Sequence, residues 1–236
     1  MTDLKSFPVG GLAAVNGANG GIGRALVEAL SGVNQFGAVL GFSRRADGLD
    51  LTDEASIAKV AHCVHQHNIP VRLVIVATGL LHDGDLQPEK SWRQLDAARL
   101  ARSFAVNATG PALVAKHFLP LFPREGKAVF AALSAKVGSI GDNRLGGWYG
   151  YRAAKSALNQ LLHTAAIELQ RTRPDAFCVT LHPGTVATPL SAPFTSSGHA
   201  PVGAQFAATR LLGVIDSLRA ADNGCMLDHT GQPLPW

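Results

Sequence analysis

A tyrosine and a lysine, Tyr151 and Lys155, lie four residues apart in a segment that predicts a helix. From Arg152 onward this segment is rich in good helix formers, and its apolar residues recur with a helical period. Residues four apart share one face of a helix, so the two side chains can meet near a third group. Tyrosine ordinarily titrates near pH ~10, and a nearby ammonium favours the phenolate, which would lower the Tyr151 pKa and make it a usable acid/base. Because the same spacing is common on helices without any chemistry, the interpretation depends on the rest of the chain.

A glycine-rich segment near the N-terminus has the context of a phosphate-binding loop. Residues 12–15 form an apolar run typical of a strand, and residues 24–30 have a helical pattern. Glycines between them would allow a tight turn and close approach to a pyrophosphate, while the helix offers free N–H groups. The alternative is a glycine-rich turn that binds nothing. The order of strand, loop and helix favours dinucleotide binding by Gly17, Asn19, Gly20, Gly21, Ile22 and Gly23.

The end of the next expected strand, residues 38–42, indicates which dinucleotide is bound. It leads into Ser43, Arg44 and Arg45, and it lacks the acidic residue that would bond the ribose hydroxyls of NAD. Arginines at this place can bind a 2′-phosphate through charge-assisted hydrogen bonds, unless they are merely solvated. The sequence therefore predicts NADP(H) in preference to NAD(H), with Ser43 and Arg44 among the cofactor contacts.

Strands and helices alternate along the rest of the chain. Further strands are expected at residues 71–77, 127–133, 177–181 and 225–228, and further helices at 54–67, 91–104, 112–121 and 203–219. This alternation predicts an α/β protein, a single-domain Rossmann fold over residues 1–236 with a doubly wound, mainly parallel sheet and helices on both faces. Ligands bind at the carboxyl ends of such strands, so the segments that follow them should converge on one crevice.

Composition limits the classes of function. The 236 residues are 47% hydrophobic and 16% charged, as in a globular protein. The net charge of +4 is spread along the chain without a basic stripe, so we expect no nucleic-acid partner. No apolar run is long enough for a membrane helix, and the N-terminus lacks the pattern of a secretion signal, so no membrane partner is expected. The three scattered cysteines are typical of reduced thiols and favour a cytoplasmic location.

The expected helix 54–67 contains three histidines that are candidate metal ligands, His62, His65 and His67. Only His62 and His65 share a face, and neither carboxylates nor further histidines stand at ligand spacing. We interpret them as polar surface residues and expect no metal.

Taken together, these motifs resemble the short-chain dehydrogenase/reductase family over essentially the entire chain. The resemblance rests on the glycine segment 17–23, on Asn107, on Tyr151 with Lys155, and on Pro183-Gly184 with Thr188. Residues 138–155 and the ending 228–236 are similar to the C-factor and sniffer-type carbonyl reductase branch.

The resemblance implies a role for each matching residue. Tyr151 would be the general acid in reduction, protonating the carbonyl oxygen as hydride arrives from the nicotinamide. Lys155 would hold the nicotinamide ribose hydroxyls and lower the Tyr151 pKa, and Asn107 would anchor a water that relays protons to Lys155. Further cofactor contacts are implied for Asp50 and Leu51 at the adenine, for Thr188 at the nicotinamide amide, and for Ala77, Thr78, Gly79, Pro183, Gly184 and Val186.

The chain departs from the family pattern in two places. The serine that usually holds the substrate carbonyl is replaced by Ala135, and the loop from there to Tyr151 looks longer than usual. Ser139 could take over this role if the loop folds inward, and Ser134 is the second candidate. The usual Asn-Ala-Gly after the central strand reads Ala77-Thr78-Gly79, so we expect cofactor support there to differ from that of the family.

The resemblance implies an NADP(H)-dependent oxidoreductase that transfers hydride between the nicotinamide and a small carbonyl or alcohol substrate. The alternative is a C-factor-like signalling or regulatory protein that binds the cofactor with little turnover. Joint retention of Tyr151, Lys155 and Asn107 argues against that alternative.

The substrate pocket is expected between Trp148, residues 80–87 and a Ser-, Pro- and Gly-rich loop at about 189–202. The apolar part of this loop favours a small or hydrophobic carbonyl compound. Family members often pair through the helix that carries Tyr151 and the one after it, which implies a homodimer or homotetramer here, with Leu161, Leu162 and Ile167 in the contact.

Overall fold

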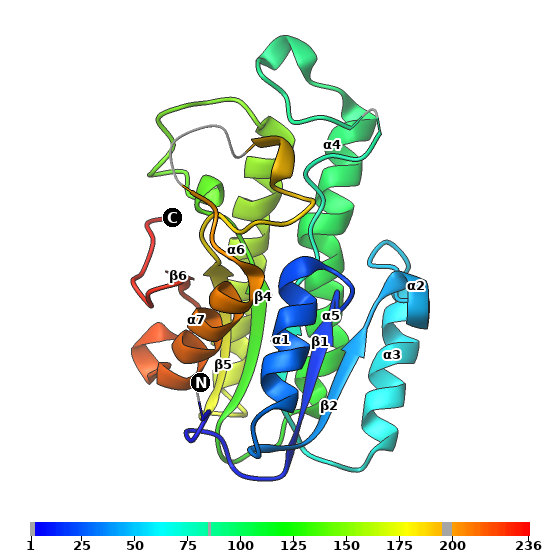
Figure 1. Cartoon of the computed structure of the whole chain (residues 1–236), viewed down its shortest axis with the longest axis vertical. Helices are drawn as coiled ribbons and strands as arrows, with labels where there is room; N and C mark the ends of the chain where they lie inside the picture. The colour runs from blue at the N-terminus through cyan, green and yellow to red at the C-terminus, as the bar shows by residue number, and fades with distance from the viewer. Residues whose placement is uncertain (1–2, 85, 195–199) are drawn as a thin grey trace.

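A single six-stranded sheet forms the centre of the computed structural model, which describes residues 3–84, 86–194 and 200–236 (Figure 1). The strands pair in parallel in the order β2-β1-β3-β4-β5-β6, which confirms the α/β prediction. The order reverses between β1 and β3, and ligands of such sheets bind at this switch point. The strand bounds are β1 Gly11–Asn16, β2 Phe36–Phe42, β3 Val71–Val76, β4 Ala128–Leu133, β5 Ala176–His182 and β6 Met226–Asp228.

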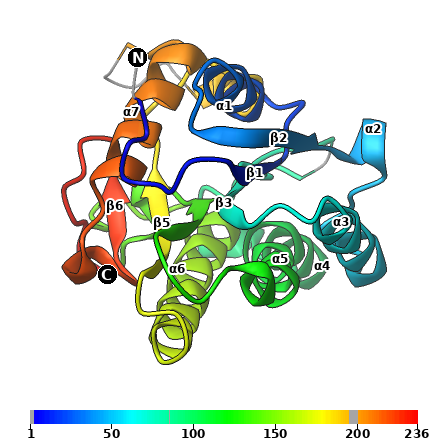
Figure 2. The same cartoon turned by 90° about the horizontal axis from the view of Figure 1, so that it is seen from below.

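Helices cover both faces of the sheet, as Figure 2 shows. Helices α1 and α7 pack on one face, and α3, α5 and α6 pack on the other, with α4 against α6. Every residue of β1 and β4 is buried, which explains why these strands read as continuous apolar runs without alternation. The helix bounds are α1 Gly21–Ser31, α2 Arg44–Asp47, α3 Glu54–Gln66, α4 Ala97–Phe104, α5 Gly110–Phe118, α6 Tyr149–Gln170 and α7 Ala204–Ser217.

One helix prediction needs correction. The helix expected at 91–104 starts only at Ala97, because the Asp96 side chain accepts a hydrogen bond from the backbone N–H of Arg99 at 2.9 Å and caps α4 there. The gap between the expected helices 91–104 and 112–121 contains a π-helical turn, Ala105–Thr109, that joins α4 to α5. A π turn inserts an extra residue into a helix and is frequent at functional sites.

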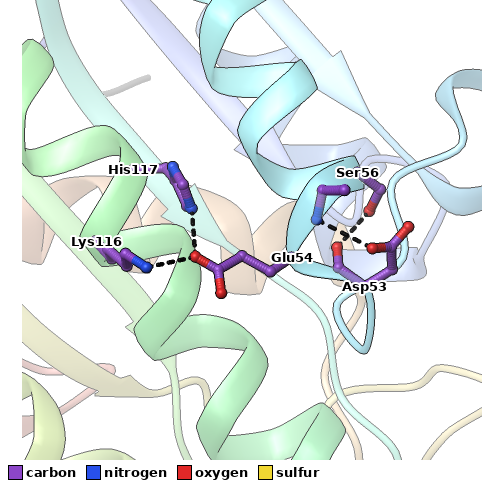
Figure 3. Close-up of polar contacts among 6 residues, drawn as sticks. Asp53, Glu54, Ser56, Lys116 and His117 are labelled. Carbon is purple, nitrogen blue, oxygen red and sulfur yellow. Dashed lines mark hydrogen bonds and ion pairs between the residues drawn. The ribbon is translucent and has the colours of Figure 1, made fainter.

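Glu54, the first residue of α3, ties this helix to α5 (Figure 3). Its Oε1 accepts a hydrogen bond from Lys116 Nζ at 2.6 Å and contacts His117 Nε2 at 2.9 Å. The neighbouring Asp53 caps the first turn of α3 through its Oδ1. These contacts fix the segment that leads from Asp50 into the helix at the edge of the sheet.

No helix in the described ranges is both long enough and apolar enough to cross a membrane.

Candidate active site

The glycine loop closes tightly between β1 and α1. Gly17 has a left-handed φ of +94°, and its N–H donates to the carbonyl of Phe42 at 2.7 Å. A Cβ on Gly23 would collide with the carbonyl oxygen of Gly17, so a side chain cannot fit there. Gly20 provides no side-chain cap for α1, which leaves first-turn N–H groups of this helix available to an anion.

The segment after β2 lies beside this loop. Asn19 Nδ2 donates to Ser43 Oγ at 2.9 Å, so the glycine loop and the strand end are linked directly. Ser43 Oγ also accepts from the N–H of Ala46 and caps α2, a short helix that the sequence did not predict. A cavity of about 320 Å³ follows, lined in part by Ser43, Arg44, Asp50, Leu51, Thr78 and Gly79.

A second cavity, of about 250 Å³, connects the glycine loop to the predicted catalytic pair. Its wall includes Tyr151 and Lys155 on α6 and the turns after three strands. The predicted residues that meet in this wall are Asn19, Gly20, Gly21, Ile22, Ala77, Thr78, Gly79, Ser134, Pro183 and Thr188. Gly184 and Val186 lie in the adjoining cavity, which also contains Tyr151.

Burial dominates the electrostatics of the pair. Lys155 is 2% exposed, and its Nζ donates to the carbonyl of Leu133 at 2.8 Å. Desolvation lowers the pKa of Lys155 to about 7 and raises the pKa of Tyr151 to about 12. The predicted lowering of the Tyr151 pKa by Lys155 is therefore not found within the protein itself. At neutral pH Tyr151 keeps its proton, the state that a general acid requires.

Asn107 is fully buried in the π-helical turn. Its Oδ1 accepts from the N–H of Leu80 at 2.9 Å, and its Nδ2 donates to the carbonyl of Leu80 at 2.7 Å. Both halves of the amide are thus satisfied by one backbone residue, which accounts for a polar side chain in an otherwise apolar run. The side chain fixes the segment after β3 at the crevice.

The two candidate serines differ in placement. Ser134 lies in the walls of both cavities that contain Tyr151, and its Oγ donates to Asn159 Oδ1 at 2.8 Å. Ser139 is 1% exposed, and its Oγ accepts from the N–H of Asp142 at 3.1 Å within its own loop. The expected inward fold that would bring Ser139 to the substrate is not observed, because the hydroxyl is used to hold the loop turn.

The cavity next to Tyr151 has a volume of about 300 Å³, and aromatic side chains form one side of it. The ring of Trp148 lies edge-on to Tyr151 with centroids 6.3 Å apart, and to Phe194 at 5.1 Å. Leu81 and Leu190 add apolar surface, so residues from the predicted segments 80–87 and 189–202 do meet here. Residue 85 and residues 195–199 of those segments lie outside the described residues.

Four lining residues were not predicted from the sequence, namely Lys136, Val137, His182 and Thr185. His182 directly precedes Pro183-Gly184 at the end of β5, and this position was the available signal. Burial and the neighbouring His229 lower the His182 pKa to about 4, so its ring is neutral at pH 7. Within the described part of the chain, Nδ1 of each of these two histidines is buried without a hydrogen-bond partner.

No group of three or more His, Cys, Asp or Glu side chains that could hold a metal ion occurs among the residues placed by the structure.

Comparisons with known proteins agree with this geometry. The sequence model of a family described as short chain dehydrogenase matches residues 32–197. The C-signal of Myxococcus xanthus is 34% identical over 143 residues, which are 60% of this chain and 81% of that protein.

Solved structures share the fold. The carbonyl reductase Sniffer of D. melanogaster is 23% identical with a TM-score of 0.79, covering 97% of this chain and 100% of that one. An NADPH-bound carbonyl reductase from chicken fatty liver is 24% identical with a TM-score of 0.84, covering 99% of this chain and 97% of the other. The expected membership of the short-chain dehydrogenase family and the likeness to C-factor are confirmed, and the sniffer-type carbonyl reductase shares the fold.

Proposed function

Because this chain belongs to the short-chain dehydrogenase family, we propose that it is an NADP(H)-dependent oxidoreductase acting on small carbonyl or alcohol substrates. The observation that carries the proposal is the shared cavity wall, in which the glycine loop, Tyr151 and Lys155 meet. A dinucleotide lying along this wall from α1 would bring its nicotinamide end to Tyr151.

Two features of the crevice suit a bound dinucleotide, an open passage beside Gly21 and an unpaired hydroxyl on Thr78 among the described residues. A Cβ on Gly21 would lie 2.8 Å from Thr188 Cγ2, so glycine keeps the passage between the loop and Thr188 open. Thr78 Oγ1 is buried without a partner among the described residues, and Thr78 lines two cavities of the crevice. A cofactor hydroxyl or phosphate would satisfy it.

The bound nicotinamide supplies or accepts the hydride, and residues of the chain manage the proton. In reduction, Tyr151 donates its phenolic proton to the carbonyl oxygen, since its pKa of about 12 keeps it protonated. Lys155 gives one N–H to Leu133 and has two left for the ribose hydroxyls. Ser134, the serine in the cavity wall, would hold the substrate carbonyl once its hydroxyl proton turns from Asn159 Oδ1 to the substrate oxygen. The amide of Asn107 is paired with Leu80, so Asn107 would position the water that relays protons to Lys155 by fixing the backbone after β3.

Cofactor preference rests on Arg44. It lines the cavity after β2 together with Asp50, whose carboxylate interacts electrostatically with Arg44. Asp47 is used to hold α2, because its Oδ2 accepts a hydrogen bond from the N–H of Ser43 at 2.8 Å. The Arg44 guanidinium can pair with a 2′-phosphate. This supports NADP(H) over NAD(H).

The substrate is a small or hydrophobic carbonyl compound. The cavity beside Tyr151 holds about 300 Å³ and is walled by Trp148, Phe194, Leu81 and Leu190, which leaves space for a compact apolar body.

A second candidate is a signalling protein that binds the cofactor with little turnover. It is favoured by Ala135, which stands where the family has its serine, and by the hydrogen bond that directs Ser134 toward Asn159. The relative named C-signal adds to this possibility.

We further propose that residues 1–236 act as one NAD(P)-binding domain in the cytoplasm, where the free thiols of all three cysteines would persist. Pairing into a homodimer or homotetramer would use α6, which carries Tyr151, and the helix after it, α7. Leu161 and Ile167 are 43% and 49% exposed and suit this contact, whereas Leu162 is 1% exposed and belongs to the core, contrary to expectation.

The decisive experiment is NADPH consumption over a panel of aldehydes, ketones and quinones. We expect Tyr151→Phe to lower turnover by roughly 10²- to 10⁴-fold and to leave NADPH binding nearly intact. Lys155→Ala should lower both the turnover and the affinity for NADPH. Tyr149→Phe serves as the matched control, because the position has the wrong spacing to Lys155. Measurable NADPH binding without turnover on any carbonyl would favour the signalling candidate.

A further inference from the structure

The helix that carries Tyr151 begins without a cap of its own. Trp148, which precedes α6, has a left-handed backbone with φ of 55° and ψ of 39°, and its side chain caps nothing. The first turn of α6 contains no acidic residue. Unpaired N–H groups at the start of a buried helix cost free energy unless something outside the helix accepts from them.

Glu89 provides these acceptors from a distant part of the chain. Its backbone carbonyl accepts from the N–H of Trp148 at 2.5 Å, and its Oε2 accepts from the N–H of Gly150 at 3.1 Å. One residue of the segment between β3 and α4 therefore receives two N–H groups at the start of α6. A carboxylate at this end of a helix is also stabilised by the helix dipole.

Glu89 is buried, and this makes its hydrogen bond with the N–H of Gly150 important. The residue is 5% exposed, and no ion pair with it is found in residues 3–84, 86–194 and 200–236. A buried carboxylate without a cation is costly, so the N–H of Gly150 is an important partner. A Cβ on Gly150 would lie 2.9 Å from Glu89 Oε1, which means that glycine permits the close approach.

Gly150 also lies close to α4, the helix that leads into the π-helical turn carrying Asn107. The place of a Cβ on Gly150 is also 3.2 Å from Leu100 and 3.6 Å from Ser103, both on α4. Ser103 Oγ accepts a hydrogen bond from Asn107 Nδ2 at 3.4 Å. Gly150 is thus held between Glu89 and α4, and Tyr151 is the next residue along the chain.

We propose that Glu89 is a positioning residue for Tyr151, capping the first turn of α6 so that the phenol is held at the cavity. The consequence for catalysis rests on the proposed reductase function, whereas the effect on the Tyr151 ring does not. Glu89 touches neither substrate nor cofactor in this proposal and acts only through the backbone of α6.

The test compares three variants with the wild type. Glu89→Ala removes the side-chain acceptor, and Glu89→Gln keeps an oxygen acceptor of the same reach without the charge. Asp96→Ala is the matched control, because it removes the N-cap of α4 and not that of α6. We expect Glu89→Ala to lower kcat by about 10- to 100-fold with the NADPH dissociation constant changed by less than about threefold, and Glu89→Gln to recover most of the loss.

A measurement on the ring itself keeps the proposal independent of turnover. The chain has only two tyrosines, so fluorotyrosine labelling gives two ¹⁹F signals, and Tyr149→Phe assigns the signal of Tyr151. We expect Glu89→Ala to shift and broaden the Tyr151 signal, and Asp96→Ala to leave it in place.

An unchanged Tyr151 signal in folded Glu89→Ala would overturn the proposal, whatever the turnover. Equal losses of kcat in Glu89→Ala and Asp96→Ala would overturn it as well, because they would reflect general destabilisation. A displaced Tyr151 signal in a protein that reduces no carbonyl would uphold the positioning role and refute the proposed function.

Discussion

Lys155 directs its ammonium to the carbonyl of Leu133 at 2.8 Å, while Nζ lies 5.7 Å from the centre of the Tyr151 ring. The spacing of four residues thus brings the two groups to one face of α6. Burial, however, moves the pKa of each group toward its neutral form. Burial therefore keeps the Tyr151 phenol uncharged. Protonating the buried Lys155 costs free energy, and hydrogen bonds to a bound ribose can offset this cost.

Because burial makes the charged form of Lys155 costly, we expect the free energy of unfolding to depend on pH. The Lys155 pKa is about 7 in the folded protein against 10.5 ordinarily, so between these values the unfolded chain holds more protons. The free energy of unfolding contributed by Lys155 therefore rises with pH through this window. We expect Lys155→Met to raise the Tm most at about pH 6 and progressively less toward about pH 10.

Thermal denaturation of both proteins across this range measures the effect. Lys127, whose pKa burial lowers to about 8, provides the control, since Lys127→Met should act with the same sign but less strongly. A Tm difference for Lys155→Met that stays constant with pH would contradict the assignment.

Arg44→Ala should narrow the preference for NADPH over NADH by roughly tenfold or more, the worth of a charge-assisted hydrogen bond. Arg44 lines the cavity after β2, so its loss should weaken NADPH binding and leave NADH binding almost unchanged. Dissociation constants for both cofactors check this, with Arg45→Ala as the neighbouring control. An unchanged ratio in Arg44→Ala would exclude it as the phosphate ligand.

Ser134→Ala should lower kcat/KM by roughly tenfold or more, because one hydrogen bond to the reacting oxygen is lost. Ser139→Ala should have a smaller effect, since its hydroxyl accepts from Asp142 inside the loop. Ala135→Ser, which restores the serine of the family pattern, should increase kcat/KM. Steady-state kinetics of the three variants decide between the serines, and a larger loss in Ser139→Ala would reverse the assignment.

Gly138→Ala should disturb α6 at the level of Lys155. A Cβ at this glycine would lie 2.7 Å from Lys155 Cβ and 3.0 Å from its carbonyl carbon, so the helix must shift. We expect a loss of about 1–3 kcal/mol in the free energy of unfolding together with lower turnover. Gly203→Ala is the control, because a Cβ there meets nothing within 4 Å. Denaturant unfolding that shows equal stability for both variants would refute the crowding argument.

Local patterns predicted much of this molecule. The glycine loop, the strand ends and the pair Tyr151 and Lys155 follow from spacing within short segments, and the parallel sheet follows from the alternation of strands with helices. The convergence of these segments on one crevice needed only the rule that parallel strands end on the same edge.

Other features depend on tertiary contacts that short segments do not encode. Glu89 caps a helix that begins sixty positions later, and nothing near it in the sequence marks a cap. Leu161 and Leu162 are adjacent leucines, and the packing against the sheet decides which one is buried. The hydrogen bond of the Ser139 hydroxyl could not be predicted, because its partner, the N–H of Asp142, is placed by the fold of a loop without periodicity.

The packing of α1 against α7 has a consequence for biosynthesis. The helix that follows the glycine loop is among the first elements to be made, yet its partner on that face of the sheet is among the last. Pairings of such long sequence separation form slowly, and a nascent chain that ends before α7 leaves the apolar side of α1 uncovered. A dinucleotide bound at the glycine loop would therefore stabilise this face of the sheet fully only once α7 has been made, and until then aggregation competes with folding.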